Sequence, residues 1–176
     1  MFKTLIIGAA LALVAFPVAA AEIDCGDATL VKSAKLKIAA CIDPADWVAG
    51  TGTGDQEFVY FTKDQKAGFA IVTEAPVVTM DAYHDAIIAF ATKQSGATEG
   101  SVSSYDDATQ EINGKTWGSM HYDVTVQGTK LEFLNYYYSE EGLGSTQFIF
   151  WSLPEDAGTV SANFADKVIE TATVTE

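Results

Sequence analysis

The sequence predicts an α+β fold in which helices pack on an antiparallel β-sheet. The stretch from Ile112 to Leu153 reads as three consecutive strands joined by glycine-containing turns, and a separate hairpin pattern precedes it. Two helical patterns lie outside these strand groups instead of alternating with single strands. Because strands and helices in separate runs are typical of α+β domains, we predict a single sheet-and-helix body.

The first residues have the composition of an export signal. One lysine is followed by an apolar run from Leu5 to Val18 and by the small residues 19–21. This order is typical of a secretory signal peptide. A retained membrane anchor is the alternative, but the run is shorter than the roughly 20 residues that span a bilayer. A lipid on Cys25 is disfavoured because charged residues precede that cysteine.

The leader sets the expected domain organisation and location. We predict a signal peptide over residues 1–21 and one mature domain over residues 22–176. Since the remaining chain has no comparable apolar run, we expect no stable membrane insertion after cleavage. The expected location is the periplasm or the extracellular medium of a bacterium.

Two cysteines, Cys25 and Cys41, remain in the mature chain. An even number of cysteines in an exported protein favours a structural disulfide. A metal-binding or redox pair is the alternative, but the wide spacing lacks the C-x-x-C arrangement of such sites. We predict a Cys25–Cys41 disulfide.

The charge of the chain excludes some partners. The formal net charge is −14, and the sequence contains no arginine. Nucleic acid and anionic lipid attract cationic proteins, so neither is an expected partner. The small cluster of Lys32, Lys35 and Lys37 is too weak to reverse the field. Cations, basic proteins and neutral ligands remain compatible with this charge.

The N-terminal third begins with weak patterns. Leu36, Ile38 and Ala40 alternate with Lys35 and Lys37, which predicts an edge strand with outward lysines, and a short helix is the alternative. The glycine-rich residues 51–55 lack the lysine and helix of a phosphate-binding loop, so we interpret them as a loop tip.

A hairpin and a helix follow. Residues 57–62 and 68–74 alternate in hydrophobicity and predict two paired strands. Residues 79–95 predict a helix with Thr79 as the N-cap and Gly96 just beyond the C-terminus.

The meander is the clearest strand signal. A weaker strand ends at Ile112 just before it, and the polar, turn-rich segment further upstream contains a possible strand near residues 101–105. Asn113-Gly114 predicts a type I′ turn, which needs positive φ at both central residues. Three strands follow, over residues 115–126, 129–139 and 145–153. Both faces of the last two are aromatic, which indicates cover on both sides or an exposed aromatic surface.

The C-terminal segment predicts one more helix. Val160, Phe164 and Val168 recur every fourth residue, which is typical of an amphipathic helix over residues 156–171. We expect residues 171–176 to fray.

Several motifs together resemble the PsbP-like fold, which is shared with Mog-type Ran-binding proteins and several exported bacterial proteins. The matching features cover most of the mature chain: Pro44-x-x-Trp47, the Phe58 to Glu74 hairpin, the Thr79 to Ser95 helix, Ile112-Asn113-Gly114, the tyrosines at Asn135 to Tyr138, and Phe148 to Pro154 leading to Phe164. The resemblance implies an α/β/α sandwich and a non-enzymatic accessory or binding role. No catalytic residue carries over.

The two histidines offer the alternative, enzymatic hypotheses. His121 shares a strand face with Ser119 and Asp123, but neighbours along one strand point side by side and do not converge as in a catalytic triad. His84 and Asp81 lie one helical turn apart and would need a third ligand to hold a divalent cation; a solvated helix edge is the simpler interpretation. We therefore predict neither catalytic residues nor a metal or cofactor.

Aromatic side chains are the residues most open to a binding role. Core packing is their usual role in strands, but three consecutive tyrosines cannot all point one way. The predicted partner-contact residues are Trp117, Tyr136, Tyr137, Tyr138 and Trp151.

The function predicted first is an exported, non-catalytic binding or accessory protein that supports a partner protein or envelope complex. The alternatives are a hydrolytic or metal-dependent enzyme and a carrier of a small hydrophobic ligand.

Overall fold

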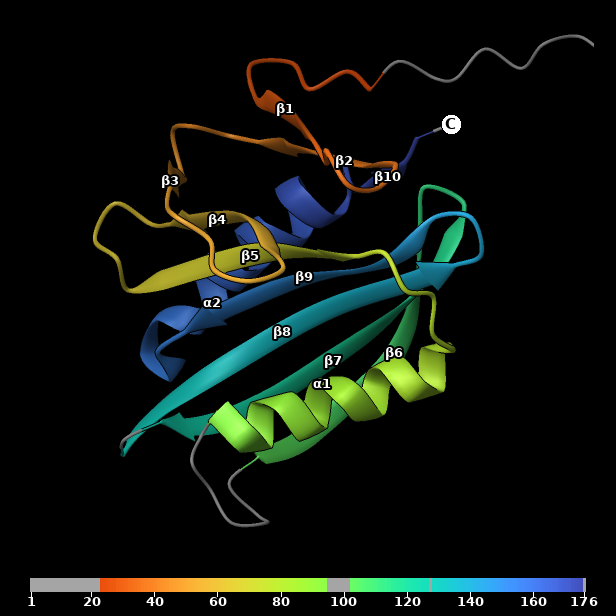
Figure 1. Cartoon of the computed structure of the whole chain (residues 1–176). Helices are drawn as coiled ribbons and strands as arrows, with labels where there is room; N and C mark the ends of the chain where they lie inside the picture. The colour runs from red at the N-terminus through yellow and green to blue at the C-terminus, as the bar shows by residue number, and fades with distance from the viewer. Residues whose placement is uncertain (1–22, 95–101, 127, 176) are drawn as a thin grey trace, which may run out of the picture.

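The computed structural model describes residues 23–94, 102–126 and 128–175 of the chain. The predicted signal peptide, residues 1–21, lies outside this range, as do the expected helix-terminal Gly96 and the turn residue Gln127. Figure 1 shows one large twisted sheet with a helix on each face and a small sheet beside it. The predicted α+β fold is confirmed, with the layers of an α/β/α sandwich.

The large sheet contains seven antiparallel strands in the order β3-β4-β5-β9-β8-β7-β6. Their bounds are β3 Val48–Ala49, β4 Gln56–Phe61, β5 Ala67–Glu74, β6 Val102–Ile112, β7 Lys115–Val126, β8 Thr129–Glu140 and β9 Gly144–Ser152. The hairpin β4–β5 and the meander β7–β8–β9 were both predicted. They join into one sheet because β5 pairs with β9 along eight registered positions, from Ala67↔Ser152 to Glu74↔Ser145.

The turn between β6 and β7 has the predicted backbone. Asn113 has φ of 48° and Gly114 has φ of 75°, so both central residues are left-handed, as a type I′ turn requires. β6 ends at Ile112 as predicted, and it is one continuous strand that also includes most of the possible strand near residues 101–105. Its polar residues from Asp106 to Glu111 are exposed at the edge of the sheet, which explains why their composition resembled a loop.

The helices cover opposite faces of the large sheet. α1 (Met80–Gln94) packs its buried Tyr83 and Ile87 against Met120 and Tyr122 of β7. Thr79 caps this helix as predicted, since its hydroxyl accepts a hydrogen bond from the Ala82 amide at 3.2 Å. On the other face, α2 (Pro154–Asn163) continues into a π-helical turn, η1 (Phe164–Ile169).

The main core lies between the large sheet, η1 and the small sheet. Phe164 is fully buried and contacts the rings of Phe69, Phe150 and Tyr136 at centroid distances of 5.2, 5.4 and 6.3 Å. This core accounts for the apolar residues on the second face of β8 and β9. Cover on both faces, rather than an exposed aromatic surface, is therefore the arrangement observed.

The small sheet corrects two predictions. Its order is β1 (Thr29–Lys32), β2 (Ile38–Ile42) and β10 (Thr173–Val174), so β2 is a central strand and all its residues are buried. The predicted strand is present as β2, but its predicted edge position is wrong, because β1 and β10 pair with its two sides and Lys35 and Lys37 lie in the turn before it. The alternative short helix is not observed. Residues 171–176 were expected to fray, but β10 pairs with β2 and the Thr175 amide donates to the Lys37 carbonyl at 2.8 Å.

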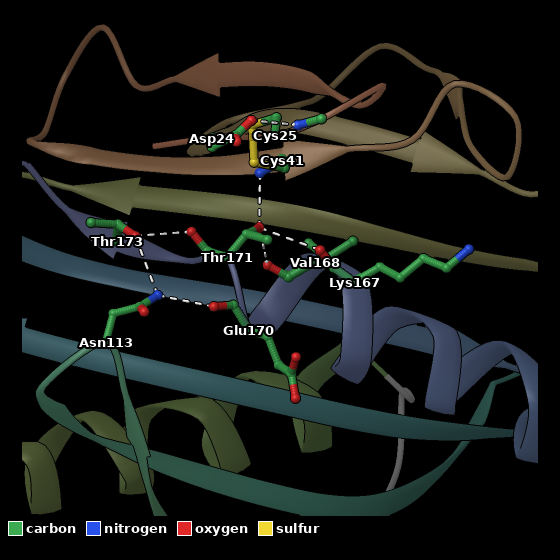
Figure 2. The surroundings of a disulfide bond; sticks show 10 residues. Asp24, Cys25, Cys41, Asn113, Lys167, Val168, Glu170, Thr171 and Thr173 are labelled. Atoms are coloured by element: carbon green, nitrogen blue, oxygen red, sulfur yellow. Dashed lines mark hydrogen bonds between the residues drawn. A yellow bond between two sulfur atoms is a disulfide. The ribbon is translucent and has the colours of Figure 1, made fainter. Parts of the chain in front are cut away.

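The predicted Cys25–Cys41 disulfide is present, and it ties the N-terminal segment to β2. Figure 2 shows the bond above the end of η1, where the Cys41 amide donates to the Thr171 hydroxyl at 2.9 Å. Asn113 contacts the same region, because its side-chain amide donates to the carbonyls of Glu170 and Ala172, both at 2.9 Å. The β6–β7 turn, the C-terminal segment and the small sheet are thus held together.

Glu57 of β4 links the small sheet to the large one. Its carboxylate accepts hydrogen bonds from the Ser33 hydroxyl and the Ala34 amide in the β1–β2 turn, and from the Thr73 hydroxyl of β5. Burial raises the pKa of Glu57, but these hydrogen bonds outweigh burial and lower that pKa below its usual 4.5.

We expect the lowered pKa of Glu57 to make stability depend on pH in the acid range. A carboxyl group whose folded pKa lies below its unfolded pKa contributes stability above the unfolded pKa, and this contribution is lost as pH falls through the folded pKa. The free energy of unfolding should therefore fall between about pH 5 and pH 3, and Glu57→Gln should flatten that fall. Urea unfolding at a series of pH values measures the effect. The exposed Glu141→Gln is the matched control, and an unchanged acid dependence in Glu57→Gln would contradict the assignment.

Candidate functional site

A groove of about 720 Å³ lies between α1 and the face of the large sheet that α1 covers. We call it the α1 groove. Most of its lining is apolar and comes from α1 and from four strands of the sheet. The apolar lining residues are Val72, Ala86, Ile87, Phe90, Ala91, Val124, Leu131, Phe133, Ile149 and Trp151.

One face of α1 forms the wall of the groove. Tyr83, Ala86, Ile87, Phe90 and Ala91 follow the i, i+3, i+4, i+7, i+8 spacing that puts residues on one side of a helix. Tyr83, Ile87 and Ala91 are buried, whereas Phe90 is 58% exposed. Phe90 therefore presents a large apolar side chain to solvent beside the groove.

A band of polar side chains crosses the floor of the groove. The Tyr83 hydroxyl donates to Glu74 Oε2 at 2.8 Å, and Tyr83 also hydrogen-bonds Gln147. Asn135 Nδ2 donates to Gln147 Oε1 at 3.0 Å, and the Asn135 amide also donates to the Tyr122 oxygen. The band thus links α1 to the four strands β5, β9, β8 and β7. A small number of placed polar groups in an apolar hollow is typical of small-molecule sites.

Both tyrosines of the band remain protonated. Burial raises the pKa of the Tyr122 phenol to about 12. Burial and the negative charge of Glu74 raise the pKa of Tyr83 above its usual value. Their hydroxyls therefore act as neutral hydrogen-bond donors at physiological pH, and neither provides a phenolate nucleophile.

The charged residues that line the groove are all acidic. They are Asp55, at the loop before β4, and Glu74, at the end of β5. Lys35 contacts Asp55 at 3.8 Å, but no lysine or histidine belongs to the lining within the described residues. The groove thus has a negative bias, in agreement with the charge of the whole chain.

The two histidines lie outside the α1 groove lining. His121 contacts Glu132 with a nitrogen–oxygen distance of 2.6 Å, and Asp123 pairs with Lys130 at 2.6 Å, so both residues of the alternative His121–Asp123 hypothesis have other partners. His84 contacts Asp85 at 3.2 Å and Asp107 at 3.4 Å, rather than Asp81, its partner in the alternative metal-site hypothesis. These are pairings on the sheet and helix surface.

His84 is biased toward its charged form. Burial lowers the pKa of His84, but the hydrogen bonds to Asp85 and Asp107 outweigh burial and raise that pKa above its usual value. A protonated histidine between two carboxylates is an ion pair, whereas a metal ligand must be neutral. Across residues 23–94, 102–126 and 128–175, the histidines, cysteines and carboxylates form no group of three or more that could hold a metal ion.

The predicted partner-contact residues lie mainly in the core. Trp117 is fully buried, and Tyr136, Tyr137 and Tyr138 are 6–7% exposed. Tyr136 and Tyr138 pack on the η1 side, whereas Tyr137 packs on the α1 side, edge-on to Tyr83. These four residues are thus buried in the free chain, and their contact with a partner stays a prediction. Trp151 alone of the five lines the groove.

Sequence reasoning missed the polar band. Asn135 and Gln147 lie in strands dominated by aromatic residues, and both point to the α1 side together with Phe133 and Tyr137. The sequence did contain a signal for the band, because each of two adjacent strands has an amide residue on its apolar face. Buried amides need hydrogen-bond partners. The Tyr83–Glu74 bond could not be read from the spacing of residues in the chain.

Comparison with solved structures identifies proteins with a similar fold. The cyanobacterial PsbP protein (CyanoP) of Synechocystis sp. PCC 6803 superposes with a TM-score of 0.61 at 14% identity, over 90% of this chain and 99% of that chain. The fold is PsbP-like. The predicted resemblance is thereby confirmed at the level of the fold.

Other solved structures are more distant. A protein from Bacteroides thetaiotaomicron matches the PsbP-like chain with a TM-score of 0.51 at 14% identity, over 86% of this chain and 50% of that one. A Pseudomonas aeruginosa protein of unknown function matches with a TM-score of 0.45 at 14% identity, over 80% and 93%. Comparison of the sequence with models of protein families and with curated proteins finds no match. Within the described residues, no helix has the length and hydropathy needed to cross a bilayer.

Proposed function

We propose that this PsbP-like protein is an exported, non-catalytic binding protein whose α1 groove holds a small apolar ligand. The observation that carries the proposal is the groove itself, with its apolar walls and its band of hydrogen-bonded polar side chains. Its volume falls within the range of about 300–1,000 Å³ that is usual for ligand pockets.

Two further features support export and a binding role. The leader has the composition of a signal peptide, and a disulfide is typical of proteins outside the cytoplasm. The phenols of the groove are held neutral, and the histidines lie elsewhere, so the groove lacks an activated nucleophile beside a general base. Binding without turnover is the function that such a site supports best.

The sequence-based alternative of a carrier for a hydrophobic ligand is preferred over the partner-protein form, because the predicted contact residues are mostly buried.

A matched pair of helix substitutions tests the proposal. Ala86 and Ala89 are both exposed on α1, but only Ala86 lines the groove. Ala86→Trp should fill part of the groove, whereas Ala89→Trp should leave it open. We expect the neutral dye N-phenyl-1-naphthylamine to bind the mature protein and Ala89→Trp with similar affinity, and to bind Ala86→Trp at least about tenfold more weakly.

Fluorescence titration of the purified protein measures this difference, with circular dichroism to confirm that each variant is folded. Equal dye affinity in all three proteins would mean that the dye binds elsewhere. A mature protein that binds no dye, or that turns over a substrate in an activity screen, would overturn the proposed function.

A further inference from the structure

Asn135 of β8 carries a buried acceptor that the protein does not satisfy. The residue is fully buried and lines the α1 groove, and its Oδ1 atom has no hydrogen-bond partner among the described residues. Its Nδ2 is already used by Gln147. Buried amide oxygens are nearly always paired, so an unpaired one in a groove marks a place for a donor from a ligand.

Asn135 Oδ1 is the one buried acceptor of the polar band that has no hydrogen-bond partner among the described residues. The Tyr83 hydroxyl donates to Glu74, and the Asn135 amide nitrogen donates to Gln147. Glu74 adds a negative charge to the same groove. A head group that fits must therefore donate hydrogen bonds, and a positive charge on it would be favoured.

The charge of the groove lining also favours a positively charged head group. Asp55 and Glu74 are its charged members; Lys35 contacts Asp55 at 3.8 Å, whereas Glu74 has no cationic partner among the described residues. An anionic head would meet this carboxylate and a chain of net charge −14, which disfavours a carboxylate or phosphate ligand.

The position of the band sets the shape of the ligand. Asn135, Phe133 and Leu131 lie at alternate positions of β8 and all line the groove, with Trp151 beside Phe133 on β9. Four residues of extended strand separate Asn135 from Leu131, a distance of about 13 Å, which is roughly the length of a ten-carbon alkyl chain. A polar head at Asn135 would leave the apolar tail along this surface.

We infer that the α1 groove selects an amphiphile with a primary ammonium head and an alkyl tail, and that Asn135 binds the head while the charge of Glu74 favours it. This inference rests on the proposed function. Asn135 Oδ1 accepts a hydrogen bond from the ammonium group, Glu74 supplies the charge that favours it, and Leu131, Phe133 and Trp151 cover the tail.

A series of probes with one tail length and four heads separates these contributions. Calorimetry in about 0.15 M salt compares decylamine, decyltrimethylammonium, decan-1-ol and decanoate, each below its micelle concentration. We expect decylamine to bind most tightly. Decyltrimethylammonium keeps the charge but has no N–H, and decan-1-ol keeps a donor but has no charge, so each should bind about tenfold more weakly. Decanoate should bind at least about a hundredfold more weakly.

Two variants connect the preference to the named residues. Glu74→Gln keeps the acceptor for Tyr83 and should remove most of the advantage of decylamine over decan-1-ol. The exposed Glu141→Gln, which makes the same chemical change outside the groove, should keep that advantage. Asn135→Leu should remove the advantage of decylamine over decyltrimethylammonium. If Asn135→Leu does not fold, the head-group series and the Glu74→Gln variant still test the inference about the head group.

The outcomes separate this inference from the proposed function. If all four probes bind alike, or if decanoate binds best, the groove holds apolar tails but the inference about the head is wrong. If Glu74→Gln and Glu141→Gln weaken decylamine equally, the preference comes from the overall charge and the inference is again wrong. If neither the four probes nor the dye binds, the proposed function itself fails.

Discussion

Replacement of Phe164 by alanine is expected to lower the free energy of unfolding by about 3–5 kcal/mol. Phe164 is fully buried at the start of η1, and its ring contacts Phe69, Tyr136 and Phe150 of the large sheet. Truncation removes these contacts and leaves a cavity that the strands on one side and the helix on the other cannot close. Urea unfolding followed by far-UV circular dichroism measures the loss.

Phe90→Ala provides the matched control, because it makes the same chemical change at a side chain that is 58% exposed. We expect it to change stability by no more than about 0.5 kcal/mol. Phe164→Leu keeps most of the volume and should cost about 1–2 kcal/mol. A Phe164→Ala loss no larger than that of Phe90→Ala would contradict the position of Phe164 in the core.

Phe164 also illustrates what the sequence can predict. The four-residue spacing of Val160, Phe164 and Val168 predicted an amphipathic helix, and the structure buries Phe164 and Val168. The period did not predict that the helix changes from α to π geometry at Phe164. Two residues after η1, the Thr171 hydroxyl accepts a hydrogen bond from the Cys41 amide of β2, which is a tertiary contact that a local period does not predict.

The central meander was predictable because its signals are local. Asn113-Gly114 specifies a turn with two positive φ angles, and the alternating strands fix which side chains share a face. The small sheet was not predictable in the same way. β2 pairs with β10, whose residues lie more than 130 positions later in the chain, and short strands joined at that distance leave no periodic signal.

The α1 groove was partly predictable from the sequence. The helix pattern predicted that Tyr83 and Ile87 lie on one apolar face, and the strand alternation fixed the orientation of Asn135. Their meeting depends on α1 crossing β7 and β8, which is a tertiary contact. The aromatic residues were misleading for the same reason: composition marked Tyr136 and Tyr138 as unusual, but the second helical layer that buries them was visible only in the fold.

Loss of the disulfide is the second large expected effect. Cys25 and Cys41 are separated by 16 residues, and closing a loop of this length stabilises a fold by about 3 kcal/mol on the chain-entropy model. The double variant Cys25→Ala/Cys41→Ala should therefore lower the melting temperature by about 6–12 °C for a domain of this size. The N-terminal segment before β1 should become the first part of the chain to exchange amide hydrogens, because the disulfide is what ties it to the buried strand β2.

The reductant provides an internal control. Dithiothreitol should lower the melting temperature of the oxidised protein by a similar amount and should leave the double variant unchanged, since that variant has no bond to reduce. Neither cysteine lines the α1 groove, so dye binding should survive in the variant at temperatures where it is folded. Equal melting temperatures for the oxidised protein, the reduced protein and the variant would show that β1, β10 and the Cys41–Thr171 hydrogen bond hold β2 in place without the covalent bond.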